Sequence, residues 1–340
     1  MSSDLIVSLQ NVTRSFGSVV ALRDLNFSVA PGQVTVLLGP NGAGKTTAIR
    51  TITGALAPDV GTARTFGLDP ASKDGQEVRE RCGVVSAKPS LYDRLSGWDN
   101  LRYAAELYGL GKGAAADARI EESATIFAIE SALDHAVGGY STGMKPRLAL
   151  ARAVLHEPDL LLLDEPTSGL DPESALAVLA LIGEMAADGQ SVLMSTHLLL
   201  EAEGLADEVV VMQAGTSLES GRPDELAERF WPHKQVRISS GIPEGLDALA
   251  SQTGVKTYER NGNTATLDLE DMDLIPQLVA FVADRNVPIQ SVVPVEPSLE
   301  DLYFAIRRKR GSVEGELAPP GGSSGRPSRI EPGSGLSAAA

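Results

Sequence analysis

The sequence predicts an α/β fold with a parallel sheet, followed by a smaller α+β unit. Short continuous apolar runs such as Val34–Gly39 ("VTVLLG") and Leu160–Glu165 ("LLLLDE") recur, with helical stretches between several of them. This is the pattern of buried parallel strands. Hydrophobic residues make up 43% of the chain and aromatic residues only 4%, which fits an interior of Ala, Leu and Val. The length of 340 residues favours one large domain plus a smaller one.

Further elements of the large unit follow the same reasoning. The apolar runs Ser191–His197 and Glu208–Gln213 predict two more buried strands. A helix should start after Asp171, because Asp171 can act as its N-cap and Pro172 can occupy its first turn. The stretch Ala175–Ala187 continues with good helix formers.

The second unit begins after about Gly221. Its sequence pattern predicts a βαββαβ order, which is typical of a ferredoxin-like sandwich. We expect its strands and helices at Gln235–Ser239, Glu244–Gln252, a hairpin turning at Asn261–Gly262, Leu274–Arg285 and Ile289–Val295. Ser298 and Asp301 have capping-box spacing at the start of a last helix. The predicted domains are therefore residues 1–221 and 222–310, with a tail over 311–340 that is rich in Gly, Pro, Ser and Ala and expected to be disordered.

Charge and cysteine content exclude some classes of function. The net charge of −16 argues against a broad nucleic-acid footprint, so no nucleic-acid partner is expected. Cys82 is the only cysteine, which excludes an intrachain disulfide and suits a reducing compartment; we expect it to be a small buried residue. The start of the chain lacks signal-peptide features, and no 18-residue apolar run occurs. We therefore expect a soluble, cytoplasmic chain that meets the membrane only through a partner.

The strongest chemical signal is "GPNGAGKTT". Gly39, Gly44, Lys45 and Thr46 satisfy the phosphate-loop pattern G-x-x-x-x-G-K-[ST], between an apolar strand and a helical stretch. Backbone N–H groups and a helix N-terminus can then cradle phosphates, with Lys45 on the β- and γ-phosphates and the Thr46 hydroxyl on Mg²⁺. A plain glycine turn between strand and helix is the alternative, and the strand, motif and helix in order argue against it.

"LLLLDEP" predicts the second half of a nucleotide site. The four leucines indicate a buried strand whose end presents Asp164 to the magnesium ion and places Glu165 beside it. A carboxylate at Glu165 can orient and partly deprotonate the attacking water if it stays ionised near the γ-phosphate. An Asp-Glu pair alone is more often a solvated strand end, but the phosphate loop favours the functional interpretation.

With these motifs the chain resembles the ATP-binding cassette family, the nucleotide-binding subunits of ABC transporters. The resemblance covers about Leu5–Arg222, and its motifs stand in family order: the phosphate loop, "YSTGM" (Tyr140–Met144), "LLLLDE", "SGLD" (Ser168–Asp171) and "STH" ending at His197. It implies a P-loop NTPase fold of the cassette type with a helical subdomain. It also implies ATP as substrate and Mg²⁺ as cofactor.

The resemblance also implies roles for single residues. "YSTGM" is similar to the family signature that contacts ATP held by the other copy, and Asp171 to the residue that links two facing sites. His197 resembles the switch histidine and is counted with Glu165 as catalytic, while Phe16 resembles the aromatic that stacks on adenine. For both, a purely structural role is the alternative; His135 and His156 match no motif. The metal ligands expected are Thr46 and Asp164, and the ATP-binding residues expected are Phe16, Gly39, Pro40, Asn41, Gly42, Ala43, Gly44, Lys45, Thr46, Thr47, Ser141, Gly143 and Asp171.

Two positions depart from the family pattern. Ala87 stands where the family normally has a glutamine that senses Mg²⁺ and the transport partner, and an alanine side chain cannot coordinate a metal. Pro146 stands where a glutamine is usual and removes one backbone donor early in the signature helix. At Ala87, either a water molecule or a neighbouring group takes the place of the glutamine, or the chain couples nucleotide to its partner differently. Pro146 predicts a somewhat weakened site.

The predicted function is ATP hydrolysis that drives an exporter. The segment Leu91–Leu110 and the second unit resemble ATPases paired with exporters of drugs, antibiotics, lipids or polysaccharides. The expected partners are separately encoded transmembrane permease subunits, contacted through the helix around Trp98–Tyr108, and a second copy of the chain, at the cytoplasmic face of the membrane. That helix can alternatively pack only on its own domain. One rival is a soluble cassette ATPase acting on ribosomes or DNA, which the single phosphate loop and the short Lys45–Ser141 interval disfavour. The other is a regulatory ATP-binding protein with little turnover.

Overall fold

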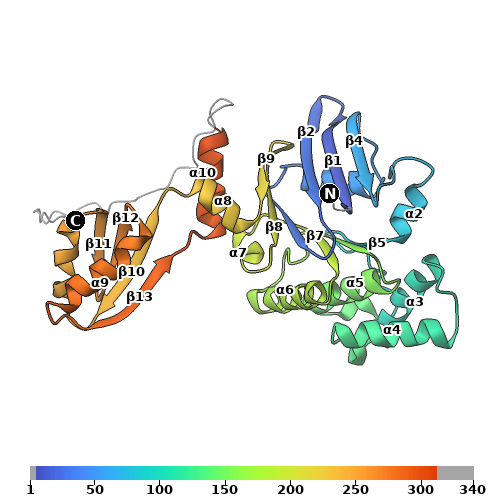
Figure 1. Ribbon diagram of the computed structural model, residues 1–340. Coiled ribbons are helices and arrows are strands. Elements are labelled where there is room, and N and C mark those ends of the chain that lie inside the picture. The colour runs from blue at the N-terminus through green and yellow to red at the C-terminus, as the bar shows by residue number, and fades with distance from the viewer. Residues whose placement is uncertain (1–4, 312–340) are drawn as a thin grey trace, which may run out of the picture.

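A computed structural model describes residues 5–311 and contains three β-sheets within them (Figure 1). The central sheet has six strands in the order β5-β6-β7-β3-β8-β9 and is parallel except for β9. Its strands are β3 (Val34–Leu38), β5 (Cys82–Val85), β6 (Leu160–Asp164), β7 (Ser191–Thr196), β8 (Glu208–Gln213) and β9 (Thr216–Gly221). The predicted α/β fold and its four predicted strands are confirmed, each to within one residue at its ends.

Both faces of this sheet are buried, which explains the continuous apolar runs. Leu161 and Leu163 of β6 belong to one hydrophobic core, whereas Leu160 and Leu162 belong to another on the opposite face. Side chains alternate between the faces of a strand, so four consecutive leucines serve two cores. Cys82 is buried at 1% exposure, as expected.

One core lies between the central sheet and an antiparallel sheet that the sequence analysis did not predict. This sheet has the order β2-β1-β4 and consists of β1 (Val7–Phe16), β2 (Val19–Val29) and β4 (Val60–Thr65). Helix α1 (Lys45–Ile52) contributes its buried side to the same core, and α2 (Gly75–Glu80) precedes β5. The phosphate loop is therefore attached to a helix that is held between two sheets.

Helices lie on the other side of the central sheet (Figure 1). Next to the sheet are α5 (Met144–Val154), α6 (Pro172–Ala187) and the short α7 (Leu199–Ala202), and α3 (Gly97–Leu107) and α4 (Ala114–Ile126) pack against α5. The 3₁₀ turns η1 (Glu130–Ala132) and η2 (Val137–Gly139) precede α5. Asp171 caps α6, since its carboxylate accepts a hydrogen bond from the Ser174 N–H at 3.0 Å, as predicted. Within residues 5–311, no helix has both the length and the apolar character needed to cross a membrane.

The C-terminal sheet has the split βαβ arrangement that the ferredoxin-like prediction requires. Its order is β11-β12-β10-β13, so the third strand in sequence pairs between the first two, and a separate hydrophobic core lies under it. Its elements are β10 (Lys234–Ser240), η3 (Pro243–Ser251), β11 (Val255–Asn261), β12 (Thr264–Leu269), η4 (Met272–Leu274), α9 (Ile275–Ala283) and β13 (Ile289–Val295).

Two local predictions in this unit were wrong in detail. The first helix is a 3₁₀ helix, η3, in which the buried Leu246 and Leu249 are three residues apart and lie on one face because a 3₁₀ turn has three residues. The hairpin turn lies one residue later than predicted, because Asn261 pairs with Thr264 and leaves Gly262–Asn263 as the loop. Gly262 has φ +59°, and glycine at the first loop position is typical of a type II′ turn.

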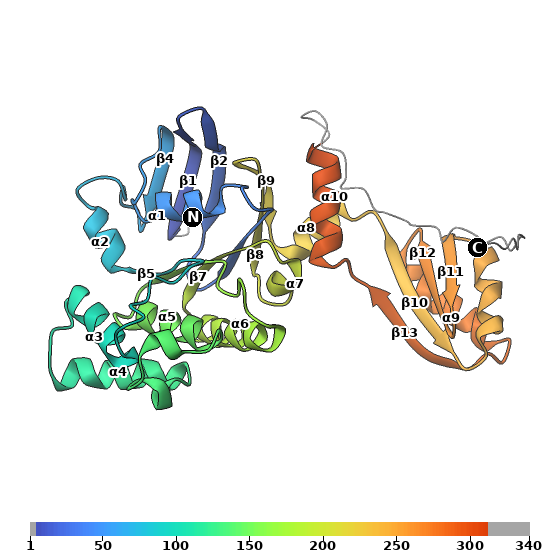
Figure 2. The same ribbon diagram turned by 180° about the vertical axis from the view of Figure 1, so that it is seen from behind.

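Helices α8 (Pro223–Phe230) and α10 (Leu299–Gly311) lie outside the C-terminal sheet and pack on the cassette (Figure 2). Their apolar side chains, among them Phe230 and Ile306, belong to the same core as α5 and β6. The predicted capping box opens α10: Asp301 N donates to Ser298 Oγ at 3.2 Å and Ser298 N donates to Asp301 Oδ2 at 3.1 Å. Of the predicted tail, Gly311 is the last residue of α10 and 312–340 lie outside the described residues. The domain limits stay a prediction.

Because α8 and α10 pack on the cassette, we expect a deletion that keeps them and a truncation that removes them to differ in their effect on the stability of the cassette. Replacing residues 232–297 with a flexible linker of about ten residues, which can span roughly 30 Å, should leave a cooperatively folding cassette, because the removed part has its own core. Truncation after Gly221 should give a less stable protein, because it uncovers the core under α8 and α10. Thermal unfolding followed by circular dichroism measures both. Equal stability of the two proteins would show that these helices do not support the cassette.

Candidate functional site

The phosphate loop joins β3 to α1, and two of its glycines fit where no side chain can. Gly44 has φ +101°, and a Cβ there would lie 2.7 Å from the Ala21 carbonyl oxygen. A Cβ on Gly39 would lie 2.4 Å from the Met212 carbonyl oxygen. These contacts are backbone contacts that cannot move aside, so the loop needs glycine at both positions. Its backbone amides then surround the N-terminus of α1, which is the geometry of a phosphate cradle.

Lys45 is buried, with 5% of its surface exposed. Its Nζ donates hydrogen bonds to the carbonyl oxygens of Gly39 at 2.8 Å and Pro40 at 3.2 Å, and lies 3.3 Å from Glu165 Oε1. A buried ammonium group requires such partners. These contacts hold the Lys45 ammonium group between the carbonyl oxygens of the loop and the Glu165 carboxylate.

Asp164 ties the loop to the neighbouring strands. Its Oδ2 accepts from Thr46 Oγ1 at 2.7 Å, and its Oδ1 accepts from Ser195 Oγ at 2.6 Å. The hydroxyl of Thr46 and the carboxylate of Asp164 are hard oxygen donors, which suit Mg²⁺. No group of three His, Cys, Asp or Glu side chains that could hold a metal ion occurs among residues 5–311. Mg²⁺ commonly takes one or two protein ligands together with substrate phosphates and water.

Glu165 has a strained backbone at the end of β6. Its φ is +50°, an unusual value for a residue with a side chain, and its N–H donates to the Ser195 carbonyl oxygen at 3.0 Å and to Ser195 Oγ at 3.2 Å. The carboxylate Oε1 lies 3.3 Å from His197 Nδ1 and 3.3 Å from Lys45 Nζ. Three residues far apart in the sequence therefore meet at one oxygen atom, and strain of this kind is common at functional sites.

A pocket of about 390 Å³ lies beside Lys45 and Glu165, whereas Asp164 and His197 are not among the residues that line it. Its volume is within the usual range for small-molecule sites. Ala87 and Glu165 both contribute to its wall. The other lining residues are Val19, Val20, Ala21, Asn41, Gly42, Ala43, Gly44, Lys45, Thr46 and Thr47. Phe16 is at the end of β1, paired with Val19, and is 45% exposed. Phe16 is not among the residues that line the pocket, but it belongs to the β1–β2 hairpin that also carries the lining residues Val19, Val20 and Ala21.

The "YSTGM" stretch does not contribute to this pocket. Ser141 Oγ accepts a hydrogen bond at 3.3 Å from N of Met144, the first residue of α5, whose N-cap is Gly143. Pro146 is the third residue of the helix, so it removes at most one donor at its start. Gly143 lies against α6, since a Cβ there would be 2.8 Å from Ser174 Oγ. The N-terminal ends of α5 and α6 are thus neighbours at a place away from the phosphate loop.

Asp171, the last of the predicted site residues, is exposed at the start of α6. Hydrogen bonds from the Ser174 backbone N–H and then from the Ser174 hydroxyl lower the pKa of the Asp171 carboxyl. The side chain is therefore an ionised helix cap at neutral pH.

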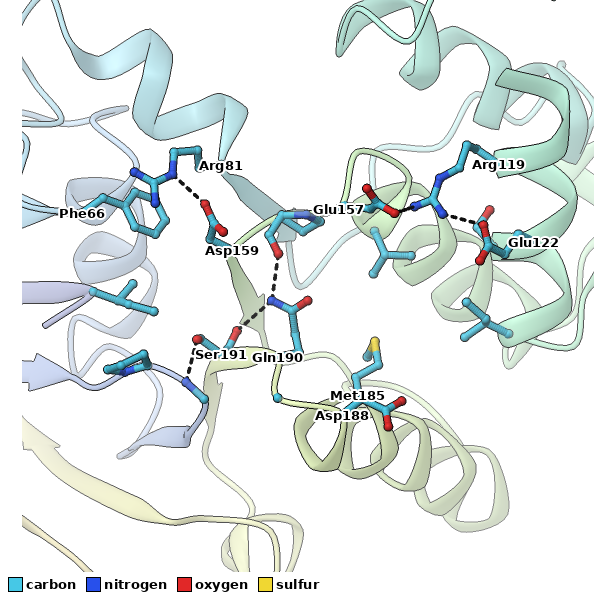
Figure 3. A pocket seen from close by; sticks show the side chains of 18 residues that line it. Phe66, Arg81, Arg119, Glu122, Glu157, Asp159, Met185, Asp188, Gln190 and Ser191 are labelled. Atoms are coloured by element: carbon cyan, nitrogen blue, oxygen red, sulfur yellow. Dashed lines mark hydrogen bonds and ion pairs between the residues drawn. The ribbon is translucent and has the colours of Figure 1, made fainter. Parts of the chain in front are cut away.

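A larger pocket of about 610 Å³ lies at the opposite end of the central sheet (Figure 3). Arg81, Asp159 and Gln190 in its wall directly precede β5, β6 and β7, so they mark the amino ends of the parallel strands. Ligands of open α/β sheets bind at the carboxyl ends instead. The arginines here are paired within the wall: Arg81 with Asp159, and Arg119 with both Glu122 and Glu157. These ion pairs account for both arginines in the wall without a ligand.

Sequence reasoning missed Ser195. This fully buried hydroxyl donates to Asp164 and accepts from the Glu165 N–H, so it holds both acidic residues in place. The sequence signal was the polar pair that precedes His197 at the end of an apolar strand. The hairpin residues Val19–Ala21 were also missed, because the pattern of β1 and β2 gave no prediction.

Comparison with known proteins follows the same division of the chain. The family model described as "ABC transporter" matches residues 22–168, and the model for the C-terminal domain of DrrA1-3-like ATP-binding proteins matches residues 221–306. The chain is 36% identical to the Nod factor export ATP-binding protein I of Bradyrhizobium diazoefficiens, over 89% of this chain and 97% of that protein. It is 36% identical to the ABC transporter ATP-binding protein NatA of Bacillus subtilis, over 66% of this chain and 92% of the other.

Other relatives are longer. The probable multidrug ABC transporter ATP-binding protein YbhF of Escherichia coli is 37% identical, over 66% of this chain, and the chain spans only 38% of its length. A solved ATP-binding subunit of an ABC transporter superposes with a TM-score of 0.60 at 32% identity, over 66% of this chain and 93% of that structure. The phosphate loop, the acidic pair at the end of β6 and these matches agree, and the chain belongs to the family of ABC transporter ATP-binding proteins, which hydrolyse ATP to power transport.

Proposed function

We propose that this chain is the ATP-hydrolysing subunit of an exporter and works as a pair of copies that hold two ATP molecules between them. The observation that carries the proposal is the meeting of Lys45, Glu165 and His197 at Glu165 Oε1, 3.3 Å from each nitrogen. A carboxylate beside a phosphate-binding lysine is placed to orient a water molecule and accept its proton.

The roles of the residues follow from their positions. The backbone N–H groups of the loop Gly39–Thr47 would bind the phosphates, and Lys45 would balance the charge on the β- and γ-phosphates. Thr46 and Asp164 would hold Mg²⁺, which supplies charge neutralisation at the phosphate oxygens. Glu165 would act as general base, and His197 would contact the γ-phosphate and keep the Glu165 carboxylate in place.

Phe16 would stack on the adenine. Its ring is 45% exposed, and the Arg14 guanidinium lies 5.1 Å from its centroid. The exposed part of the ring leaves room for a base, and base–aromatic stacking contributes about 1–3 kcal/mol.

The second copy would supply the "YSTGM" stretch. Ser141 and Gly143 stand at the N-terminus of α5, away from the phosphate loop of their own chain, and a helix N-terminus attracts a phosphate group. Asp171, which starts the neighbouring helix α6, would connect the two facing sites. Dimeric cassettes among the solved structures of the same fold support this arrangement.

Helix α3 would contact the membrane subunits. Leu101, Ala104 and Ala105 on one face are buried in the cassette core, whereas Tyr103 and Leu107 on the other are 46% and 69% exposed. Exposed apolar side chains on a helix whose other face is packed are typical of a contact with a partner. The partners would be separately encoded permease subunits, with this chain on the cytoplasmic face of the membrane. Relatives named for multidrug transport and Nod factor export support export as the direction of transport.

A regulatory ATP-binding protein with little turnover is the second candidate, because Ala87 faces the pocket without a polar side chain. The hydrolysis rate with Mg²⁺ separates the two candidates. Steady turnover supports the transporter subunit, and tight binding without turnover supports the regulatory protein.

Glu165→Gln should bind ATP normally and lower the hydrolysis rate by about 100-fold or more, because the amide keeps the shape but cannot accept the proton of the water. Phosphate release under saturating Mg²⁺–ATP measures the rate, and calorimetry measures binding. Glu173→Gln, on the exposed first turn of α6, is the matched control and should remain active. A fully active Glu165→Gln protein would remove Glu165 from the role of base.

Mixing two inactive variants should restore activity if each site is shared between copies. Lys45→Ala loses the main cation of the phosphate loop, and Ser141→Asp puts a carboxylate against the phosphate held by the other copy. Aspartate caps a helix as well as serine does, so the fold of α5 is kept. In a mixed dimer, the intact loop of one variant faces the intact signature of the other.

Phosphate release by the purified variants, alone and mixed, measures this effect. Each variant alone should be nearly inactive, and the mixture should recover part of the wild-type rate. Ser141→Asn, which adds no charge, separates the effect of the charge from that of the substitution and should lose less activity than Ser141→Asp. A mixture that stays inactive although mixed dimers form would contradict the sharing of one site, or would show that two intact sites are needed.

A further inference from the structure

A buried carboxylate that belongs to none of the motifs lies next to the site. Glu201 is on the four-residue helix α7, and only 8% of its surface is exposed. Its Oε1 accepts a hydrogen bond from Thr167 Oγ1 at 2.5 Å, and its Oε2 accepts from Thr196 Oγ1 at 2.7 Å. Both carboxylate oxygens are therefore used, each by a hydroxyl from a different segment of the chain.

Each of these segments carries a residue of the site. Thr167 is two residues after Glu165, in a turn closed by the bond from Ser168 N to the Glu165 carbonyl oxygen at 3.1 Å. Thr196 directly precedes His197, and its own carbonyl oxygen accepts from Gly39 N at 3.3 Å. Glu201 thus connects the loop of the proposed base, the loop of the histidine and the start of the phosphate loop.

The chemistry of the contact favours a carboxylate over other side chains. Thr167 and Thr196 are 4% and 1% exposed, so their hydroxyls need partners inside the protein. An ionised carboxylate only accepts hydrogen bonds, so its two oxygens can each accept from one of the two hydroxyl donors. Burying such a charge costs free energy that burying a well-packed apolar residue would not. A glutamate at position 201 is therefore better explained by the two threonines that it holds in place than by a gain in folding stability.

The loop of Glu165 needs support of this kind. Its positive φ of +50° is an unfavourable conformation that persists only where surrounding contacts fix it. Ser195 fixes the Glu165 N–H from one side, and the Glu201–Thr167 bond fixes the chain two residues later. Together these bonds hold the direction in which the Glu165 carboxylate leaves the strand.

We propose that Glu201 is a positioning residue for ATP hydrolysis, which fixes the Glu165 loop and the His197 loop relative to each other through Thr167 and Thr196. The proposal rests on the function proposed above for Glu165 and His197. Glu201 is not among the residues that line the pocket over the phosphate loop, and its two carboxylate oxygens are used by Thr167 and Thr196. Its removal should therefore lower kcat and leave the affinity for ATP unchanged.

The test compares Glu201→Ala, Glu201→Gln and the control Glu203→Ala, which changes an exposed glutamate just after the same short helix. Glu201→Ala should lower kcat by about 10- to 100-fold through misplacement of the reacting groups, while the Kd for ATP measured by calorimetry stays within about twofold. Glu201→Gln should keep most of the activity, because its oxygen accepts from one threonine and its NH₂ group donates to the other. Glu203→Ala should match the wild type.

Threonine variants keep the test decisive if Glu201→Ala does not fold. Thr167→Val and Thr196→Val keep the side-chain shape and remove one hydroxyl each, and each should lower kcat at unchanged ATP affinity. In a double-mutant cycle, adding Thr167→Val to Glu201→Ala should cause little further loss, because both remove the same bond. Assays run well below the melting temperature of each variant exclude a loss of folded protein.

Three results would overturn the proposal: a Glu201→Ala protein with the kcat of the Glu203→Ala control, threonine variants with full kcat, or additive losses in the cycle. If Glu165→Gln is inactive in the same assay while Glu201→Ala is fully active, only the role of Glu201 is lost. If the wild-type protein does not hydrolyse ATP with Mg²⁺, the proposed function itself fails.

Discussion

The parallel pairing of β6, β7 and β3 places every polar group of the site. In this register Asp164 is opposite Ser195, and Ser195 is opposite Leu37. Glu165 directly follows β6 and His197 directly follows β7, so both leave the sheet at the same edge as the phosphate loop, which follows β3. A shift by one residue would turn each of these side chains to the other face of its strand. The hydrogen bonds of Asp164 to Thr46 and Ser195 then fix the loop and two strands together.

The same register explains why the charged groups of Lys45 and Glu165 can lie next to an apolar interior. The strands themselves are buried on both faces, and the polar residues begin where the strands end. Lys45 is 5% exposed yet contacts two carbonyl oxygens and a carboxylate, so its charge is compensated inside the protein. The strain at Glu165 and the buried carboxylate of Glu201 both belong to this edge. Within residues 5–311, seven other residues with side chains also have positive φ, but Glu165 is the one whose strained backbone lies where the chemistry would occur.

The C-terminal part of the chain contacts the cassette near the site through α7 and α10. Helix α7, which carries Glu201, packs against β7 and against α10, and α10 follows the C-terminal sheet in the sequence. The side chains of α10 enter the main core of the cassette, and Arg310 pairs with Glu219 of β9. The C-terminal sheet is therefore joined to the cassette through α8 and α10, and α10 packs against the short helix that carries Glu201.

The sequence by itself determined the residue types that a phosphate site needs and the strands that carry them. The phosphate loop, the leucine run before Asp164, the Asp171 cap and the βαββαβ order are local patterns, and each depends on neighbours in the chain. The resemblance had grouped Lys45, Glu165 and His197 in one site, but only the structure shows that they meet at one oxygen atom and that Thr167, Thr196 and Glu201 join beside them. The structure also decided that β1, β2 and β4 form a sheet over α1 and that η3 is a 3₁₀ helix. Such contacts depend on strand order, register and packing, and the local pattern of the sequence does not encode these, because the partners lie far apart along the chain.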